Sequence, residues 1–245
     1  MAKAPRQMMY YNGYSAYVLD YEQGDINGDG ITDYVYLTGD KPYGMENAFA
    51  DNIAITILDG SDNKYSRISL NKDSGYNPSV FLGDFTGDNI DDILVNIDSG
   101  GSGGFLYSYI YSFLNNMPEK LFDFEEFNGK YLNDVLYKDF YKVDVISGIL
   151  GDSYTLCIEN KGKEYLSGIY GESGLLKEPL KGEVAALSGL YPVDYERDGI
   201  YELNAVQRII GRHSADTLGF LETVLGWDGG SFVPKRQHAA IPGKK

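Results

Sequence analysis

A short acidic motif recurs along the chain, and its repetition limits what the chain can fold into. The first copy, DINGDGITD, has oxygen-bearing side chains at its first, third, fifth and ninth positions, which are Asp25, Asn27, Asp29 and Asp33. Two further copies keep such a side chain at each offset: Asp84, Thr86, Asp88 and Asp92 in one, and Asp194, Glu196, Asp198 and Glu202 in the other. Matching offsets in separate copies indicate a repeated structural unit.

The spacing of the copies predicts a further unit that has lost the acidic side chains. The known copies start at residues 25, 84 and 194, and Asp139 lies midway across the longer interval. Its sequence, DFYKVDVIS, has Tyr141, Val143 and Ser147 at the other offsets. All four units share large apolar side chains at the second and seventh positions: Ile26, Phe85, Phe140 and Tyr195, then Ile31, Ile90, Val145 and Ile200. We therefore expect four units, of which the third binds no metal.

Each motif is followed by strand-like rather than helical sequence. Tyr34-Val35-Tyr36-Leu37 follows the first copy, whereas an EF-hand loop has a glutamate at its twelfth position and a helix after it. Asp59-Gly60 and Asp228-Gly229 are hairpin-turn signals, each 34 residues after the start of its motif. We predict an all-β fold, a single β-propeller domain over residues 1–245 with four blades of four antiparallel strands, and an open stack of repeats as the rival. The approximate blades are 12–73, 74–128, 129–180 and 181–241.

The motif, lying between two strands, resembles the FG-GAP or VCBS repeat, which builds the propeller of integrin α subunits. That resemblance implies calcium binding through side chains at positions one, three, five and nine and the backbone carbonyl of position seven. The implied ligands are Asp25, Asn27, Asp29, Ile31 and Asp33; Asp84, Thr86, Asp88, Ile90 and Asp92; and Asp194, Glu196, Asp198, Ile200 and Glu202. The third set contains longer glutamates that can overfill the loop, so the expected cofactor is Ca²⁺ at two sites, with a third left open.

Elementary electrostatics also favours a cation at these loops. Asp25, Asp29 and Asp33 bring three negative charges into one turn, which is unfavourable without a counter-charge. Gly30 and Asn89, at the sixth position, tolerate the left-handed backbone that a sharp turn needs. Carboxylate and carbonyl oxygens in a flexible loop prefer calcium to zinc or copper. A solvated acidic turn is the alternative.

Composition excludes two classes of partner. The chain has 36 acidic and 21 basic residues, a net charge of −15, and this field argues against nucleic-acid binding. No stretch approaches 18 consecutive apolar residues, so we expect no membrane insertion. The N-terminus lacks the apolar core of a signal peptide, although the family resemblance suggests a surface or extracellular setting.

Other candidate catalytic groups do not converge in the sequence. Ser102 lies in GGSGG between two expected strands rather than on a nucleophile elbow. His213 and His238 lie in polar surroundings typical of a surface, and the adjacent carboxylates Glu125-Glu126 and Asp91-Asp92 would point to opposite faces of a strand. We therefore predict a non-enzymatic protein.

The predicted function is a calcium-binding module or scaffold for protein–protein interaction at a cell or particle surface. The alternative is a lectin-like, carbohydrate-binding propeller that uses exposed tyrosines and Trp227, since 22 tyrosines are present. A propeller hydrolase or lyase is the competing enzyme class.

Overall fold

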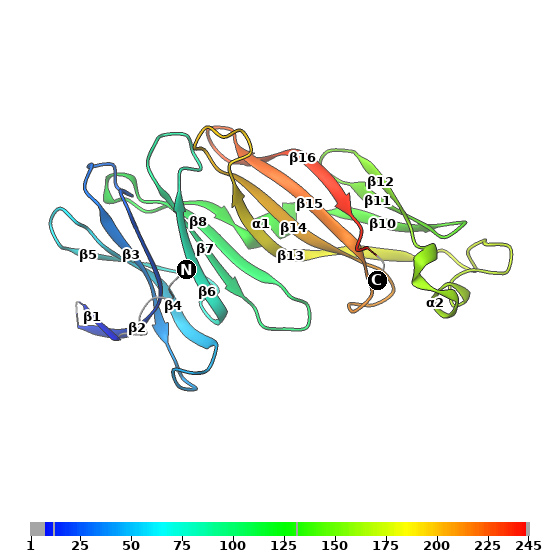
Figure 1. Ribbon diagram of the computed structural model, residues 1–245, viewed down its shortest axis with the longest axis horizontal. Helices are drawn as coiled ribbons and strands as arrows, with labels where there is room; N and C mark the ends of the chain where they lie inside the picture. The colour runs from blue at the N-terminus through cyan, green and yellow to red at the C-terminus, as the bar shows by residue number, and fades with distance from the viewer. Residues whose placement is uncertain (1–7, 12, 131, 244–245) are drawn as a thin grey trace. The chain divides into compact units, whose positions relative to one another are not determined.

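The computed structural model describes residues 8–11, 13–130 and 132–243 (Figure 1). Strands account for 54% of the structure and helices for 8%, which confirms the predicted all-β class. The strands are β1 (Met8–Tyr11), β2 (Tyr14–Gly24), β3 (Asp33–Asp40), β4 (Phe49–Leu58), β5 (Tyr65–Ser69), β6 (Gly75–Gly83), β7 (Asp92–Asp98), β8 (Leu106–Ser112), β9 (Glu119–Asp123), β10 (Asn133–Lys138), β11 (Lys142–Ser147), β12 (Ser153–Cys157), β13 (Lys181–Val193), β14 (Glu202–Ile210), β15 (Thr217–Trp227) and β16 (Phe232–Ala240). The short helices are η1 (Leu114–Asn116), α1 (Phe124–Lys130), η2 (Glu159–Lys161) and α2 (Lys163–Ser167).

The chain divides into two compact units. The first comprises Met1–Phe124, Pro192–Glu202 and Gly226–Val233, and the second comprises Glu125–Tyr191, Leu203–Leu225 and Pro234–Lys245. Strands β13 to β16 therefore contribute residues to both units.

The first nine strands form one antiparallel sheet in the order β1-β2-β3-β4-β6-β7-β8-β9, with β5 also paired to β4. Short pairing of β4 with β6, where Phe49 lies opposite Tyr76, joins two successive meanders. Alternation of side chains buries one face of these strands, as at Val35, Leu37 and Ile55, which are 0% exposed.

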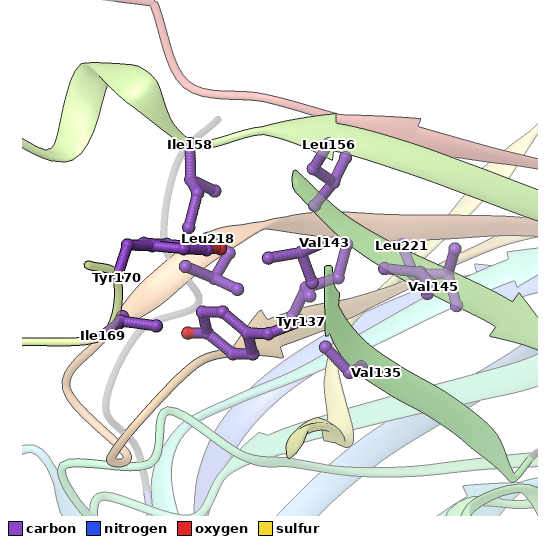
Figure 2. Close-up of a cluster of buried hydrophobic side chains, with 11 residues drawn as sticks. Val135, Tyr137, Val143, Val145, Leu156, Ile158, Ile169, Tyr170, Leu218 and Leu221 are labelled. Carbon is purple, nitrogen blue, oxygen red and sulfur yellow. The ribbon is translucent and has the colours of Figure 1, made fainter. Parts of the chain in front are cut away.

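The remaining strands form a second sheet in the order β12-β11-β10-β13-β14-β15-β16, which is nearly closed and barrel-like. Its core side chains point toward one another from β10, β11, β12 and β15 (Figure 2). The clustered residues are Val135, Tyr137, Val143, Val145, Leu156, Ile158, Ile169, Tyr170, Ile209, Leu218 and Leu221.

The predicted ring of four separate blades is not confirmed. β10 hydrogen-bonds to β13, with Asp134 opposite Glu183, so strands assigned to the third and fourth blades belong to one sheet. Side-chain alternation specifies which face of a strand is buried but leaves its edge partner open.

The third motif copy forms a tight turn between β10 and β11 instead of an acidic loop. Phe140 and Tyr141 both adopt positive φ angles, 59° and 62°. The Phe140 N–H donates to the carbonyl of Gly174 at 2.7 Å, and Asp139 Oδ1 accepts from the Leu176 N–H at 2.9 Å. Asp139 therefore anchors a neighbouring segment of the second unit.

Candidate functional site: three stacked acidic loops

Three acidic loops of the first unit connect consecutive strands. Loop A (Asp25–Asp33) follows β2, loop B (Asp84–Asp92) follows β6, and loop C (Asp194–Glu202) follows β13. These are the three motif copies that carry oxygen side chains, and each begins where its strand ends.

The three loops share one pattern of internal hydrogen bonds. The first-position carboxylate accepts from the sixth-position amide: Gly30 to Asp25 at 2.9 Å, Asn89 to Asp84 at 2.8 Å, and Gly199 to Asp194 at 3.1 Å. The fifth-position carboxylate accepts from the seventh-position amide: Ile31 to Asp29 at 2.8 Å, Ile90 to Asp88 at 3.0 Å, and Ile200 to Asp198 at 3.0 Å. The ninth-position carboxylate accepts from the second-position amide: Ile26 to Asp33 at 3.3 Å, Phe85 to Asp92 at 3.2 Å, and Tyr195 to Glu202 at 3.1 Å. The sequence repeat is therefore a repeat of structure as well.

The loops also stack on one another in the order A, B, C. The eighth-position amide of each loop donates to the first-position carbonyl of the previous one: Asp91 N–H to Asp25 O at 3.2 Å, and Tyr201 N–H to Asp84 O at 2.8 Å. At the same two junctions, Ile90 of loop B packs against Gly28 of loop A, and Ile200 of loop C packs against Gly87 of loop B. The seventh-position isoleucines thus serve as apolar contacts between loops.

The stacking of the loops leaves no room for a side chain at two glycine positions. A Cβ on Gly24 would collide with the Asp91 carboxylate, and a Cβ on Gly83 would lie 2.8 Å from the Tyr201 ring. The predicted left-handed sixth positions are also confirmed, since φ is 80° at Gly30 and 65° at Asn89.

Loop A places one carboxylate in the interior. Asp33 is 0% exposed, and Gly60 N–H donates to its Oδ1 at 2.9 Å. Burial raises the pKa of Asp33, an effect that the neighbouring carboxylates Asp59 and Asp29 reinforce and the amides of Gly60 and Ile26 oppose. The charged form of Asp33 is therefore costly in the folded protein.

Loop B shows the strongest electrostatic strain. Asp92 is 2% exposed, and burial, aided by Asp88 and Asp84, raises its pKa to about 7. Burial also raises the pKa of Asp91, which lies near Asp84 and Asp25. In addition, Thr86 Oγ1 is buried without a hydrogen-bond partner among the described residues. Loop B therefore contains both a buried hydroxyl without a partner in the described part of the chain, that of Thr86, and a buried carboxylate, that of Asp92.

Loop C is more exposed than the other two. Its ninth-position residue, Glu202, is only partly buried, whereas the corresponding Asp33 and Asp92 are buried. The longer glutamate still accepts from Tyr195 N–H. Loop C therefore shares the backbone pattern of the other loops without their buried carboxylate.

In the described parts of the chain, no three His, Cys, Asp or Glu side chains come together as a group that could hold a metal. In each loop the carboxylates at positions one, five and nine accept hydrogen bonds from amides of the same loop. The structure thus brings the predicted residues of each copy into one loop, while their role as calcium ligands stays a prediction.

The other catalytic candidates from the sequence lie apart from these loops. Ser102 is exposed in the turn between β7 and β8, and Glu125-Glu126 occupies the first turn of α1. His238 is exposed on β16, and the His213 carbonyl accepts from the Asp216 N–H at 2.7 Å.

A buried polar network in the second unit escaped the sequence reasoning. Asp216 accepts from Lys161 Nζ at 2.9 Å, from Tyr165 Oη at 2.6 Å and from the Arg212 N–H at 2.9 Å, and the Tyr165 hydroxyl also bonds to that of Tyr137 at 2.8 Å. Burial alone would raise the pKa of Asp216, but these hydrogen bonds hold it below its ordinary value. Lys161 and Tyr165 lie 55 and 51 residues from Asp216 in sequence, so no local pattern signals these contacts.

The fold and the loops define an all-β protein of two sheets with a row of acidic inter-strand loops. Residues 131–240, which contain the seven-stranded sheet, match the family described as the YybI C-terminal domain. The chain is also 46% identical over 221 residues to uncharacterized protein YybI of Bacillus subtilis (strain 168), covering 90% of this chain and 84% of that protein. The chain belongs to the YybI family.

These matches overturn the resemblance to the FG-GAP or VCBS repeat, which was wrong. The acidic motif describes one nine-residue loop, and such a loop can form between the strands of unrelated sheets. The family match instead covers the strands that form the second sheet. No helix in the described residues is long and apolar enough to cross a membrane.

Proposed function

We propose that the chain is a non-enzymatic binding or scaffold module in which loops A and B each bind a calcium ion. The observation that carries this proposal is in loop B, where the buried Thr86 Oγ1 lacks a partner among the described residues, at a predicted ligand position of the loop that also contains the buried Asp92. Buried polar atoms are normally hydrogen-bonded, so an unpaired acceptor calls for an additional group. A divalent cation would satisfy the oxygen and offset the carboxylate charge together.

The residues of loop B fit this role by chemistry. Asp84, Thr86, Asp88 and Asp92 offer hard oxygen ligands, and the carbonyl of Ile90 can complete the set. Loop A offers the corresponding residues, including an Asp33 whose pKa is raised by burial. Calcium would supply positive charge to a region where the chain accumulates negative charge, and so would stiffen the stacked loops.

Loop C is a poorer candidate for calcium binding than loops A and B. Its glutamates at positions three and nine add a methylene each, and its ninth-position carboxylate is not buried. We assign it no calcium at concentrations that fill loops A and B.

Thermal unfolding with and without calcium tests the proposal. Flexible oxygen-ligand loops of extracellular modules bind calcium with Kd of about 10⁻⁴–10⁻³ M, and tenfold excess over Kd stabilises by about 1.4 kcal/mol per site. Two sites should therefore raise the melting temperature by several degrees.

Asp88→Asn and Asp139→Asn form a matched pair for this experiment. Asp88→Asn keeps the acceptor for the Ile90 N–H but removes one charged ligand, so it should roughly halve the calcium-dependent shift. Asp139→Asn changes a loop that lacks the other ligands and should leave the shift intact. An unchanged wild-type melt in millimolar calcium, with no calcium found in the EDTA-treated protein, would contradict the proposal.

A further inference from the structure

The face of β2, β3 and β5 opposite the buried Val35 and Leu37 carries four clustered tyrosines in the first unit. We call Tyr21, Tyr34, Tyr36 and Tyr65 the tyrosine face. Tyr21 lies directly opposite Tyr36 across β2 and β3, while Tyr34 and Tyr65 both lie opposite Leu58 of β4. Directly opposed residues share a face of the sheet, so all four rings project to the same side.

The two faces of these strands differ in charge as well as burial. On β2, Asp20 and Glu22 alternate with the tyrosine face, and Asp20 accepts from the Val80 N–H on the core side. The residues of the two cross-strand rows on the tyrosine face include no carboxylate: Tyr21, Tyr36, Thr56 and Arg67, then Gln23, Tyr34, Leu58 and Tyr65. In a chain of net charge −15, this face is free of acidic side chains in both rows.

Three of the four rings form a continuous aromatic surface. Tyr36 lies 6.2 Å from Tyr21 and 6.5 Å from Tyr34 between ring centroids, with interplanar angles of 27° and 14°. The fourth ring, Tyr65, packs against the ring of Tyr11, with 5.3 Å between their centroids. Tyr21 and Tyr34 remain 42% and 38% exposed, so these two rings are accessible, whereas Thr56 in the row of Tyr36 is buried.

The hydroxyl groups of the tyrosine face have no hydrogen-bond partner within the described residues. Burial raises the pKa of Tyr36, and the neighbouring Tyr65, Tyr34 and Tyr21 add to this effect. By contrast, the hydroxyl of the adjacent, buried Tyr11 accepts from Thr56 Oγ1 at 3.1 Å. The tyrosine face thus offers several donors and acceptors that the protein itself leaves unused.

We propose that the tyrosine face binds a neutral polysaccharide. Sugar rings present apolar C–H faces that pack on phenol rings and hydroxyl groups that pair with Tyr hydroxyls and with the amide of Gln23. The charge of the protein favours a neutral polymer, because its field repels polyanions and the acidic loops, rather than this face, would attract a polycation. The polysaccharide would be the partner of the binding module proposed above, so this inference rests on that proposed function. It does not require that loops A and B bind calcium.

Retention on insoluble polymers tests this proposal. Cellulose, chitin and a (1,3)-β-glucan serve as neutral probes and heparin-agarose as an anionic one. We expect at least one neutral polymer to retain the protein in both EDTA and calcium, and heparin to retain none. Failure of all three neutral polymers, or stronger retention on heparin, would overturn the inference.

Three variants locate the binding surface. The double variant Tyr34→Ala/Tyr36→Ala should weaken retention roughly tenfold or more. Tyr36→Phe keeps the ring and removes one hydroxyl, so it should weaken retention by a smaller factor without disturbing the fold. Tyr43→Ala removes another tyrosine, 70% exposed and outside the face, and should bind as wild type.

Circular dichroism spectra of the variants show whether each is folded. Equal retention by wild type and both folded tyrosine-face variants would overturn the inference. Asp88→Asn should retain normal polysaccharide binding, so that a failure of calcium binding and a failure of polysaccharide binding are separate results.

Discussion

Replacing Asp92 with asparagine should stabilise the metal-free protein, and calcium should reduce that advantage over wild type. The side chain is 2% exposed and accepts from the Phe85 N–H at 3.2 Å. Asparagine keeps this acceptor and nearly the same shape, but it carries no charge. In the metal-free protein at pH 8, we therefore expect Asp92→Asn to be more stable than wild type.

The size of this gain follows from the pKa of the carboxyl group. Burial, together with Asp88 and Asp84, raises the pKa of Asp92 from 3.8 to about 7. Since one pKa unit corresponds to about 1.4 kcal/mol, ionised Asp92 destabilises the folded state by up to about 4 kcal/mol. Because the folded pKa lies above the unfolded one, this penalty is absent below about pH 4, grows as the pH rises toward 7, and is complete above it.

Urea unfolding in EDTA at about pH 4 and about pH 8 measures the effect as a difference in the free energy of unfolding. The variant and wild type should be similar at the lower pH and differ at the higher one. In calcium at tenfold excess, wild type should gain about 1.4 kcal/mol at loop B, and the variant should not. A variant that is no more stable than wild type at pH 8 in EDTA would refute the electrostatic reasoning.

Three further substitutions test the packing. Asp216→Asn should cost about 1.5–3 kcal/mol of unfolding free energy, because the buried Asp216 loses the charge that pairs with the partly exposed Lys161 ammonium; urea melts that match wild type would contradict this. Gly60→Ala should cost about 1–3 kcal/mol, since its Cβ would meet the carbonyl of Thr32, while the open Gly101→Ala should stay within about 0.5 kcal/mol in the same melts. Phe140→Asn should stabilise by about 1 kcal/mol in thermal unfolding, because asparagine tolerates the positive φ of 59° better than an exposed phenylalanine, and a loss of stability would count against it.

Local features of the fold could be predicted from the sequence because they depend on nearby residues. The turn signals Asp59-Gly60 and Asp228-Gly229 fall where β4 and β15 end, and both predictions are confirmed. The left-handed Gly30 and Asn89 are confirmed as well. Turn chemistry and side-chain alternation act over a few residues, so one sequence is enough to read them.

The arrangement of the sheets could not be predicted in this way. Pairing of β10 with β13 joins segments whose paired residues, Asp134 and Glu183, are far apart in sequence. Edge pairing depends on backbone groups that every residue carries, and therefore leaves little trace in composition. The Asp216 network has the same origin, because Tyr165 and Lys161 reach it only through the tertiary fold.

Part of the candidate site was predictable and part was not. The three loops were found from their spacing, but their stacking through Asp91 and Tyr201 depends on main-chain contacts between repeats. The alternation of Tyr34 and Tyr36 in the sequence is one sign of the tyrosine face. The same alternation also occurs in strands whose tyrosines pack inside a protein, so it does not identify a binding surface. The cross-strand register to Tyr21 was needed to show that these rings gather on one face.

Calcium stoichiometry tests the central claim most directly. Equilibrium dialysis of metal-free protein against millimolar calcium, followed by metal analysis, counts the ions bound per chain. We predict about two ions for wild type and about one for Asp88→Asn, with Kd of about 10⁻⁴–10⁻³ M. Wild-type protein that binds no calcium across this range would contradict the assignment of loops A and B as calcium sites.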